Sequence, residues 1–378
     1  MTKVLTNGRI FTGDEILTGY DLVVVDGCIG EVKPAGARLD NEIDLDGGLL
    51  APGFIDCQVN GGGGVLFNEQ TDAAAIARMI TAHRAFGTTG LLPTLISDDW
   101  ATMAAARDAV QGARRQGLPG LLGLHFEGPY LNPEKKGAHD SSRIRPLEQR
   151  FLSLVEGGDL GSVIVTLAPE MVPSGTVSRL SKAGVRVCAG HSAATPAQIE
   201  AAVGEGLAGF THLFNAMPAM ESRRPGIVGA ALANPATWCG IIVDGHHVDP
   251  ITLRVAVAAK ARGRMMLVTD AMPSVGAGEE SFQLSGQTVV VEGGRCVLAD
   301  GTLAGSNLDM ASAVGNSVEL LGLPLEEALR MASLYPAEFL SMADRRGRIG
   351  PGYCADLVLL DDDLNVSRTW IGGEMAIH

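Results

Sequence analysis

The feature that most restricts the fold is a series of eight short apolar runs, which lie at residues 49–55, 90–95, 121–127, 162–167, 185–189, 209–213, 239–243 and 265–269. Stretches with helical periodicity lie between or after them, at 73–86, 101–115, 196–203, 251–262 and 310–321. Eight strand–helix units are typical of a closed parallel barrel. We therefore expect an α/β protein with a (β/α)8 TIM-type barrel spanning about residues 51–345.

A doubly wound open sheet is the alternative α/β fold. It would be favoured by a G-x-G-x-x-G motif after the first strand. The tetraglycine at 61–64 instead follows Asp56-Cys57-Gln58-Val59-Asn60 and does not match that motif. We therefore favour the barrel.

The two ends of the chain have a different pattern, in which apolar and polar residues alternate between turn signals. Such runs occur at residues 3–8 and 21–27, and again at 355–361 after a glycine-rich turn at 347–352. We predict that residues 1–50 and 346–378 pair into one small β-sandwich domain beside the barrel at 51–345. A hairpin is also expected at 281–300, with its turn at 292–295.

Composition restricts the partners. The formal net charge of -14 argues against nucleic acid and against an anionic membrane, because both are polyanions. The chain has no stretch approaching about 18 unbroken apolar residues and no apolar leader near its start, which predicts a cytoplasmic protein. The six cysteines form no C-x-x-C pair, so we interpret them as mostly buried thiols.

Polar residues that close the predicted strands form the candidate active site, because the carboxyl ends of barrel strands meet at one face. Glu127 ends the third run, His191 follows the fifth, His212 lies in the sixth and Asp270 follows the eighth. One carboxylate and two imidazoles suit zinc or another borderline divalent ion and leave a position for water. His125 shares a strand face with Glu127, and its role in supporting the metal site or in the core stays open.

This set of residues predicts a particular chemistry. A divalent ion lowers the pKa of bound water from about 15.7 to around 7 and makes hydroxide available at neutral pH. Asp270 could take up the proton and later return it to a departing nitrogen, which leaves poorly unless it is protonated. We therefore expect metal-dependent hydrolysis of an amide.

A series of longer motifs runs through nearly the whole chain. They are P-G-F-I-D at 52–56, G-L-H-F-E-G-P at 123–129, K-K-G-A-H at 135–139, A-G-H-S at 189–192, T-H-L-F-N-A-M-P at 211–218, V-D-G-H-H-V-D at 243–249, V-T-D-A at 268–271 and L-A-G-S at 303–306. In order and spacing they resemble the N-acetylglucosamine-6-phosphate deacetylases of the amidohydrolase superfamily. The resemblance implies hydrolysis of N-acetylglucosamine 6-phosphate to glucosamine 6-phosphate and acetate, in amino sugar catabolism.

The resemblance also implies roles for single residues. Glu127, His191 and His212 would bind one divalent metal ion per subunit, with Zn²⁺ expected first and Fe²⁺, Mn²⁺ or Co²⁺ as alternatives, and Asp270 would be the general base and then the general acid. The sugar phosphate would be contacted by Ala138, His139, Asn215, Ala216, Arg223, Asp244, His247, Leu303, Ala304 and Gly305. Arg223 and His247 are suited to the phosphate. His139 could polarise the acetamide carbonyl or hold a sugar hydroxyl.

Two segments depart from the usual patterns. Gln58 and Asn60 stand where many amidohydrolases have a His-x-His pair for a second metal ion, and since amides bind zinc poorly, one metal is expected. Arg223 is followed by Arg224, where the family usually has an acidic residue, so either arginine could reach the phosphate. In relatives this loop lies near a subunit boundary, which favours a homodimer with a shared site.

Other functions stay open. N-acetylgalactosamine 6-phosphate differs from the gluco substrate in the orientation of one hydroxyl, and the motifs do not exclude it. A dihydroorotase-like enzyme typically uses two metals bridged by a modified lysine, and no predicted strand end presents a suitable lysine. A metal-free scaffold is disfavoured, because all four residues of the expected machinery are present.

Overall fold

Eight parallel strands form the centre of the molecule. The structure, a computed structural model, describes residues 2–36 and 42–378. The strands follow one another around the sheet as β6 (Phe54–Val59), β9 (Thr88–Ile96), β10 (Gly123–Glu127), β11 (Ser162–Leu167), β12 (Arg186–Ala189), β13 (Gly209–Phe210), β14 (Trp238–Ile241) and β15 (Met265–Leu267). Parallel pairing of Val59 with Ala271, just after β15, brings the two edges together. The expected barrel is confirmed.

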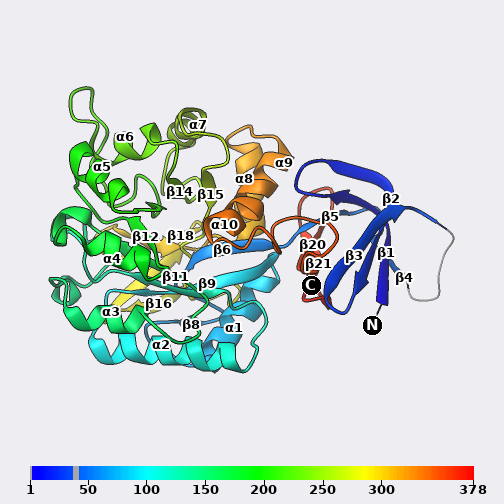
Figure 1. Ribbon diagram of the computed structural model, residues 1–378, viewed down its shortest axis with the longest axis horizontal. Coiled ribbons are helices and arrows are strands. Elements are labelled where there is room, and N and C mark those ends of the chain that lie inside the picture. Colours follow the sequence, from blue (N-terminus) through cyan, green and yellow to red (C-terminus); the bar gives the residue numbers. More distant parts are fainter. Residues whose placement is uncertain (1, 37–41) are drawn as a thin grey trace.

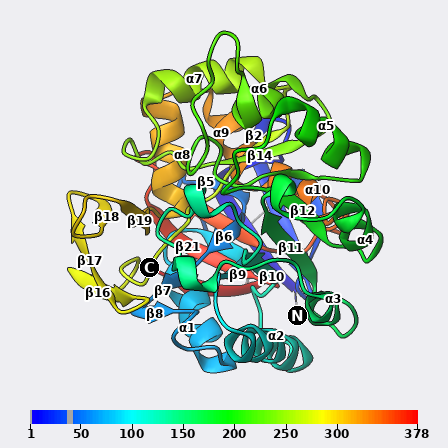
Figure 2. The ribbon, with the colours of Figure 1, turned by 90° about the vertical axis from the view of Figure 1, so that its left-hand side faces the viewer.

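Helices surround the barrel (Figures 1 and 2). They are α1 (Ala73–Arg84), α2 (Trp100–Arg115), α3 (Gln149–Val155), α4 (Thr176–Lys182), α5 (Pro196–Gly204), α6 (Gly226–Ala233), α7 (Pro250–Ala259), α8 (Met310–Glu319), α9 (Leu325–Ala332) and α10 (Leu334–Phe339). Polar caps start several of them: the Asp72 carboxylate accepts from the Ala75 N–H of α1, and Thr195 and Gln198 form a capping box on α5. Within residues 2–36 and 42–378, no helix combines the length and apolar character needed to cross a membrane.

The first predicted run, residues 49–55, is divided between two sheets. Its first half is β5 (Leu49–Pro52), which pairs with strands from both chain ends, and the barrel strand begins only at Phe54. The prediction of one barrel strand over 49–55 is therefore wrong. Pro52 has no N–H to donate, and a Cβ on Gly53 would lie 2.1 Å from Oγ1 of Thr89, so the chain changes sheets where only glycine fits.

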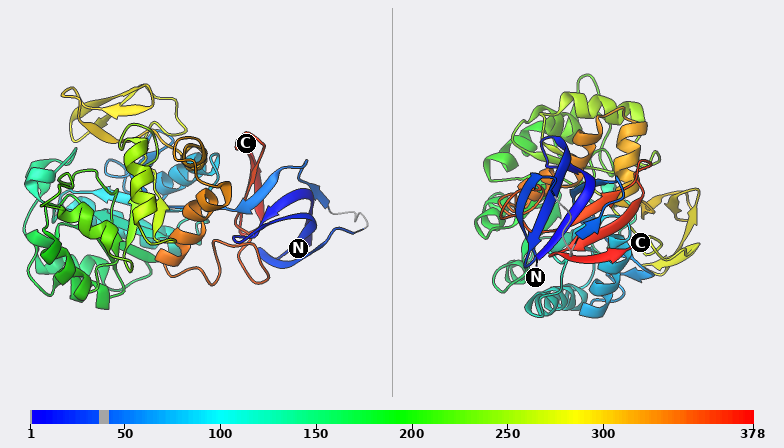
Figure 3. Two further views of the ribbon diagram at one scale, coloured as in Figure 1. Left: turned by 90° about the horizontal axis from the view of Figure 1, so that it is seen from above. Right: turned by 90° about the vertical axis from the view of Figure 1, so that its right-hand side faces the viewer.

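Both chain ends contribute to a second sheet (Figure 3). Its strands are β1 (Thr2–Phe11), β2 (Ile16–Val25), β3 (Cys28–Pro34), β4 (Glu42–Asp44), β5, β20 (Leu357–Leu360), β21 (Val366–Ile371) and β22 (Glu374–Ile377). Antiparallel pairing of β5 with β20 joins the two ends, and Leu5, Leu22, Leu357 and Trp370 share one buried cluster. Pairing of the termini is confirmed. Residues 1 and 37–41 lie outside the described residues, and the limits 1–50, 51–345 and 346–378 stay predictions.

A third sheet stands on the barrel rim. Its antiparallel strands are β16 (Ser281–Leu284), β17 (Gln287–Glu292), β18 (Arg295–Val297) and β19 (Leu303–Ser306). The expected hairpin turn is present between β17 and β18, and strands on either side extend it. Ser306 pairs with Ala271 and so attaches this sheet beside the end of β15. Short elements complete the rim: β7 (Gly61–Gly62), β8 (Val65–Leu66), and the 3-10 helices η1 (Pro133–Lys135), η2 (Ser141–Arg143) and η3 (Pro169–Met171).

Candidate active site

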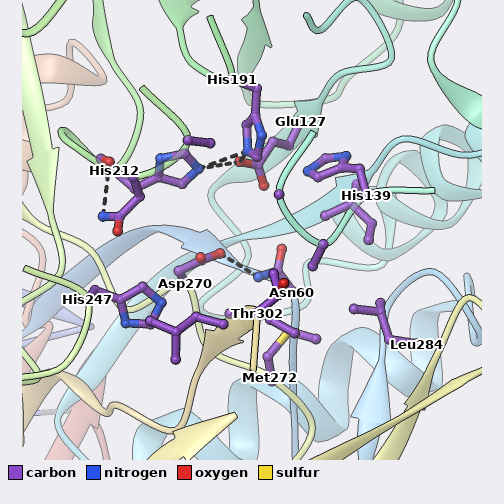
Figure 4. Close-up of a pocket in the computed structure, with 18 residues that line it drawn as sticks. Asn60, Glu127, His139, His191, His212, His247, Asp270, Met272, Leu284 and Thr302 are labelled. Atoms are coloured by element: carbon purple, nitrogen blue, oxygen red, sulfur yellow. Dashed lines mark hydrogen bonds and ion pairs between the residues drawn. The ribbon is translucent and has the colours of Figure 1, made fainter. Parts of the chain in front are cut away.

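A cavity of about 210 Å³ opens at the carboxyl ends of the barrel strands (Figure 4). Most predicted site residues line it: Glu127, Ala138, His139, His191, His212, Asn215, Ala216, His247, Asp270, Leu303, Ala304 and Gly305. Arg223 and Asp244 do not. The cavity is also lined by residues that the sequence did not single out as site residues, namely Ile96, Asn60, Gly137, Met272, Leu284 and Thr302.

Several residues at the strand ends have left-handed backbone conformations. His191, His212 and Asp270 have φ values of 48°, 30° and 54°, and Ala216 has 52°. This region is unfavourable for residues with a Cβ and persists only where the surrounding structure enforces it. Such strain gathers at functional sites, and here it marks the positions where each strand turns into its loop beside the cavity.

The side-chain atoms of Glu127, His191 and His212 that could bind a metal ion lie close together. Nε2 of His191 and Nε2 of His212 lie 3.1 Å and 2.9 Å from Oε1 of Glu127, and 3.0 Å from each other. Nδ1 of His191 is 2.8 Å from the carbonyl oxygen of Lys135, which only accepts, so Nδ1 carries the hydrogen and Nε2 presents a lone pair. Converging lone pairs from one carboxylate and two imidazoles fit a divalent cation.

Opposite pKa shifts distinguish the two acidic residues of the site. Burial alone would raise the pKa of Glu127, but close interactions with the imidazoles of His191 and His212 outweigh burial and hold this pKa well below its usual range. Burial and the negative charge of Glu127 raise the pKa of Asp270. Glu127 is therefore suited to bind a cation and Asp270 to take up a proton.

His139 lies beside these residues as a neutral hydrogen-bond donor. Burial and the neighbouring His191 lower its pKa to about 3. The Ser97 backbone N–H donates to its Nδ1 over 3.3 Å, so the ring hydrogen is on Nε2. Ligand atoms of Glu127, His139 and His191 also lie within 4.8 Å of one another, which offers an alternative metal site. We favour His212 as the third ligand, because its Nε2 lies much closer to the other two.

His125 lies in the barrel core. Its ring nitrogens are 3.1 Å from the carbonyl oxygen of Cys57 and 2.8 Å from Oγ1 of Thr166, and burial lowers its pKa to about 4. The neutral ring thus links three strands and does not line the cavity. Of the two roles left open by the sequence, this placement supports the core role.

Two amides at the end of β6 hold Asp270. Nε2 of Gln58 and Nδ2 of Asn60 donate to its Oδ1 over 3.0 Å and 2.6 Å, and Nε2 of Gln58 is also 3.3 Å from Oε1 of Glu127. The sequence indicated only that these residues replace metal-binding histidines. Their contact with Asp270 was missed, although the two-residue strand period places both on the same face as the buried Asp56.

Asp244 positions His247. One carboxylate oxygen lies 2.6 Å from Nδ1 of His247, and the other accepts the backbone N–H groups of His246 and His247 over 2.8 Å and 2.9 Å. Burial would raise the pKa of Asp244, but the hydrogen bond and charge of His247 lower it to about 2. This placement favours an indirect role for Asp244, since His247 lines the cavity and Asp244 does not.

Arg223 and Arg224 lie on an exposed turn before α6, outside the cavity. Nη2 of Arg224 is 2.8 Å from Oε2 of Glu221. Among the described residues Arg223 has no ion-pair partner. Of the two arginines, Arg223 is therefore the one that is free to meet an anion, but not in the cavity of its own chain.

Known proteins resemble this chain over its whole length. The model of the amidohydrolase family matches residues 49–376, and that of the NagA composite domain matches residues 4–50. The chain is 46% identical to an N-acetylgalactosamine-6-phosphate deacetylase of Shewanella sp. (strain ANA-3), covering 88% of this chain and 84% of the relative. It is 39% identical to the N-acetylglucosamine-6-phosphate deacetylase of Homo sapiens, over 98% and 94%.

A solved structure agrees with these relatives. The N-acetylglucosamine-6-phosphate deacetylase from Pasteurella multocida superimposes with a TM-score of 0.95 at 36% identity, covering 100% of both chains. The match therefore includes the barrel, the terminal sheet and the sheet on the rim. The chain belongs to the amidohydrolase family and, within it, to the N-acetyl amino sugar 6-phosphate deacetylases.

Proposed function

We propose that this enzyme hydrolyses the acetamide of N-acetyl-D-glucosamine 6-phosphate to D-glucosamine 6-phosphate and acetate, in amino sugar catabolism. The observation that carries the proposal is the meeting of Glu127, His191 and His212 within 3.1 Å of one another, in a cavity that also holds Asp270 and His247. Groups suited to bind a cation, to carry a proton and to bind a phosphate thus line one cavity. Amide hydrolysis of a phosphorylated substrate needs these three functions.

Glu127, His191 and His212 would hold one divalent metal ion per subunit, with Zn²⁺ as the first choice and Fe²⁺, Mn²⁺ or Co²⁺ as alternatives. When bound, such an ion polarises a carbonyl oxygen and lowers the pKa of water. His139 supports the same step, because its Nε2–H can donate to the acetamide oxygen. A sugar hydroxyl is a less suitable partner for this buried neutral ring at the metal site.

Asp270 moves the proton. Its Oδ1 is held by Gln58 and Asn60, so Oδ2 is left to accept a proton from the attacking water. The water oxygen forms a bond to the acetyl carbon, the C–N bond breaks, and the departing nitrogen takes the proton back from Asp270. Acetic acid and the free amine result, the acid passes its proton to the amine to give acetate, and Asp270 is back in its ionised form.

The remaining predicted residues would bind the sugar phosphate. His247, fixed by Asp244, is the side chain suited to the phosphate. Asn215 and Ala216 lie on the turn after His212, where Nδ2 of Asn215 donates to the His212 carbonyl oxygen, and they line the same cavity as His247. Ala138 packs against the apolar cluster that contains Ala304, and both line the cavity with Leu303 and Gly305, where they would contact the sugar and its acetyl group.

N-acetylgalactosamine 6-phosphate is the second candidate substrate. The chain is 46% identical to the Shewanella relative, which is an N-acetylgalactosamine-6-phosphate deacetylase, and this identity supports the galacto substrate. Turnover of both sugar phosphates by the purified enzyme decides between them. Equal or faster turnover of the galacto epimer would reverse our choice.

We also propose a cytoplasmic homodimer in which Arg223 reaches the phosphate bound by the second subunit. Arg223 is exposed, unpaired among the described residues and outside its own cavity. Mixing Arg223→Ala with Asp270→Asn subunits tests this proposal, because a mixed dimer then contains one complete site. No recovery of activity in dimers shown to be mixed would contradict the shared site.

Asp270→Asn tests the proposed chemistry directly. The amide keeps the shape of the side chain but cannot carry the proton, so we expect near-total loss of turnover. Metal content, measured by elemental analysis, and binding of the sugar phosphate, measured by calorimetry, are expected to stay as in the wild type. Substantial remaining turnover would remove Asp270 from the proposed role.

A further inference from the structure

The side-chain amide of Asn60 has a hydrogen-bond partner at only one end. Its Nδ2 donates to Oδ1 of Asp270 over 2.6 Å. Its Oδ1 is buried, and no group in the described part of the chain donates to it. Buried polar atoms almost always have a partner in native proteins, so this oxygen is expected to meet a donor that the protein itself does not supply.

The orientation of this amide follows from its chemistry. If the amide were turned over, Oδ1 would face the Asp270 carboxylate at 2.6 Å, and two acceptors at that distance repel. Figure 4 shows the amide beside Asp270, with its oxygen directed away from that residue toward the part of the cavity where Glu127 and His139 lie. The free acceptor thus lies next to the proton carrier, in a side chain that lines the cavity.

We propose that Oδ1 of Asn60 accepts the N–H of the scissile acetamide, an inference that rests on the deacetylase function proposed above. A secondary amide presents one acceptor and one donor. The metal site and His139 would bind the carbonyl oxygen, so the N–H still needs a hydrogen-bond acceptor. Glu127 faces the imidazoles of His191 and His212 at the candidate metal site and accepts from Gln58, and Oδ1 of Asp270 accepts from two amides. Since Oδ2 of Asp270 is assigned to the water proton, Oδ1 of Asn60 is, in the described part of the chain, the side-chain acceptor that remains next to Asp270.

This contact would contribute to catalysis as well as to binding. The Asn60 amide would bind Asp270 through Nδ2 and the substrate N–H through Oδ1. It would therefore hold the substrate nitrogen next to the carboxyl group that protonates it. When the nitrogen takes the proton it becomes positively charged, and hydrogen bonds from charged donors are stronger than those from neutral ones. The bond therefore strengthens as the C–N bond breaks, and its loss should lower kcat more than it raises KM.

The test compares two substrates in the holoenzyme: N-acetylglucosamine 6-phosphate and 2-O-acetyl-glucose 6-phosphate, an ester that lacks the N–H. Asn60→Ala removes the acceptor for the N–H and also one of the two donors to Asp270. The second loss weakens the proton carrier, on which an amine leaving group depends more than an alcohol does, and Gln58→Ala measures that loss alone. We expect kcat/KM for the amide to fall on the order of tenfold to a hundredfold more than kcat/KM for the ester. Equal losses for both substrates would overturn the proposal.

A matched control makes the result specific. Gln58→Ala removes the other donor to Asp270 and leaves Oδ1 of Asn60 in place, so its loss of the amide rate relative to the ester rate should be smaller than that of Asn60→Ala. The same amide-specific loss in both variants would contradict the proposal. If the wild type hydrolyses neither substrate, the deacetylase function itself fails.

Discussion

Replacing Asp244 by Asn tests how the phosphate-binding side of the cavity is built. Burial raises the pKa of Asp244, but the side chain of His247 and the backbone N–H groups of His246 and His247 together lower it from 3.8 to about 2; at about 1.36 kcal/mol per pKa unit this net shift corresponds to about 2.4 kcal/mol. If all of this interaction orients His247 toward phosphate, its loss lowers kcat/KM by up to about 60-fold. The effect should lie mainly in KM, because Asp244 is outside the cavity and away from the reacting atoms.

The assay compares N-acetylglucosamine 6-phosphate with N-acetylglucosamine, which has no phosphate. Only the phosphorylated sugar should lose kcat/KM. Asp249→Asn is the matched control, because it removes the same charge from the same segment, while Asn keeps the cap that Asp249 provides to Ile251 N over 2.8 Å. Equal losses for both sugars, or the same loss in the control, would refute the positioning role.

Thermal unfolding gives a second measure of the Asp244–His247 pair. A carboxyl group whose pKa is lowered in the folded state stabilises the protein above its unfolded pKa, and this contribution is lost as the pH falls through the folded value. The difference in Tm between wild type and Asp244→Asn should therefore be full above about pH 4 and should shrink toward pH 2. A difference that stays constant over this range would contradict the assigned interaction.

Three further predictions follow from other parts of the structure. His212→Ala should contain no bound metal, and a chelator should remove the metal from the wild type, both measured by elemental analysis. Added divalent ion should then restore the hydrolysis rate of the wild type but not that of His212→Ala. Burial raises the pKa of Asp56 to about 7. Between about pH 4 and 7, Asp56 is therefore protonated in the folded protein but ionised in the unfolded chain, and the free energy of unfolding falls as the pH rises. The Tm of Asp56→Asn should therefore rise relative to wild type across this window, and a constant difference would contradict it. Nζ of the buried Lys260 donates to the carbonyl oxygens of Ala231 and Asn234 over 2.6 Å each. Lys260→Met should therefore lower the free energy of unfolding, measured in urea, by about 3 kcal/mol and leave kcat unchanged. A variant as stable as wild type would show that these bonds contribute little.

Much of the architecture and the site was predictable from local patterns. Apolar runs and helical periodicity are properties of neighbouring residues, so they indicated the strand–helix units of the barrel. The rule that barrel strands share one carboxyl face then brought Glu127, His191, His212 and Asp270 together. The same reasoning missed the division of residues 49–55, because which sheet a short apolar strand joins depends on its partners, here β1 and β20.

What only the tertiary structure decided is which atoms of these residues face one another. Asn60 and Asp270 are 210 positions apart, and they meet because barrel closure places the first strand beside the last. The indirect position of Asp244 behind His247 and the exposure of Arg223 likewise depend on how the loops fold over the rim. The sequence by itself determined the set of chemical groups and the strand ends that carry them. Whether two polar atoms form a hydrogen bond depends on differences of a few tenths of an ångström in the distance between them. For residues far apart in the sequence, this distance is set only when the barrel closes.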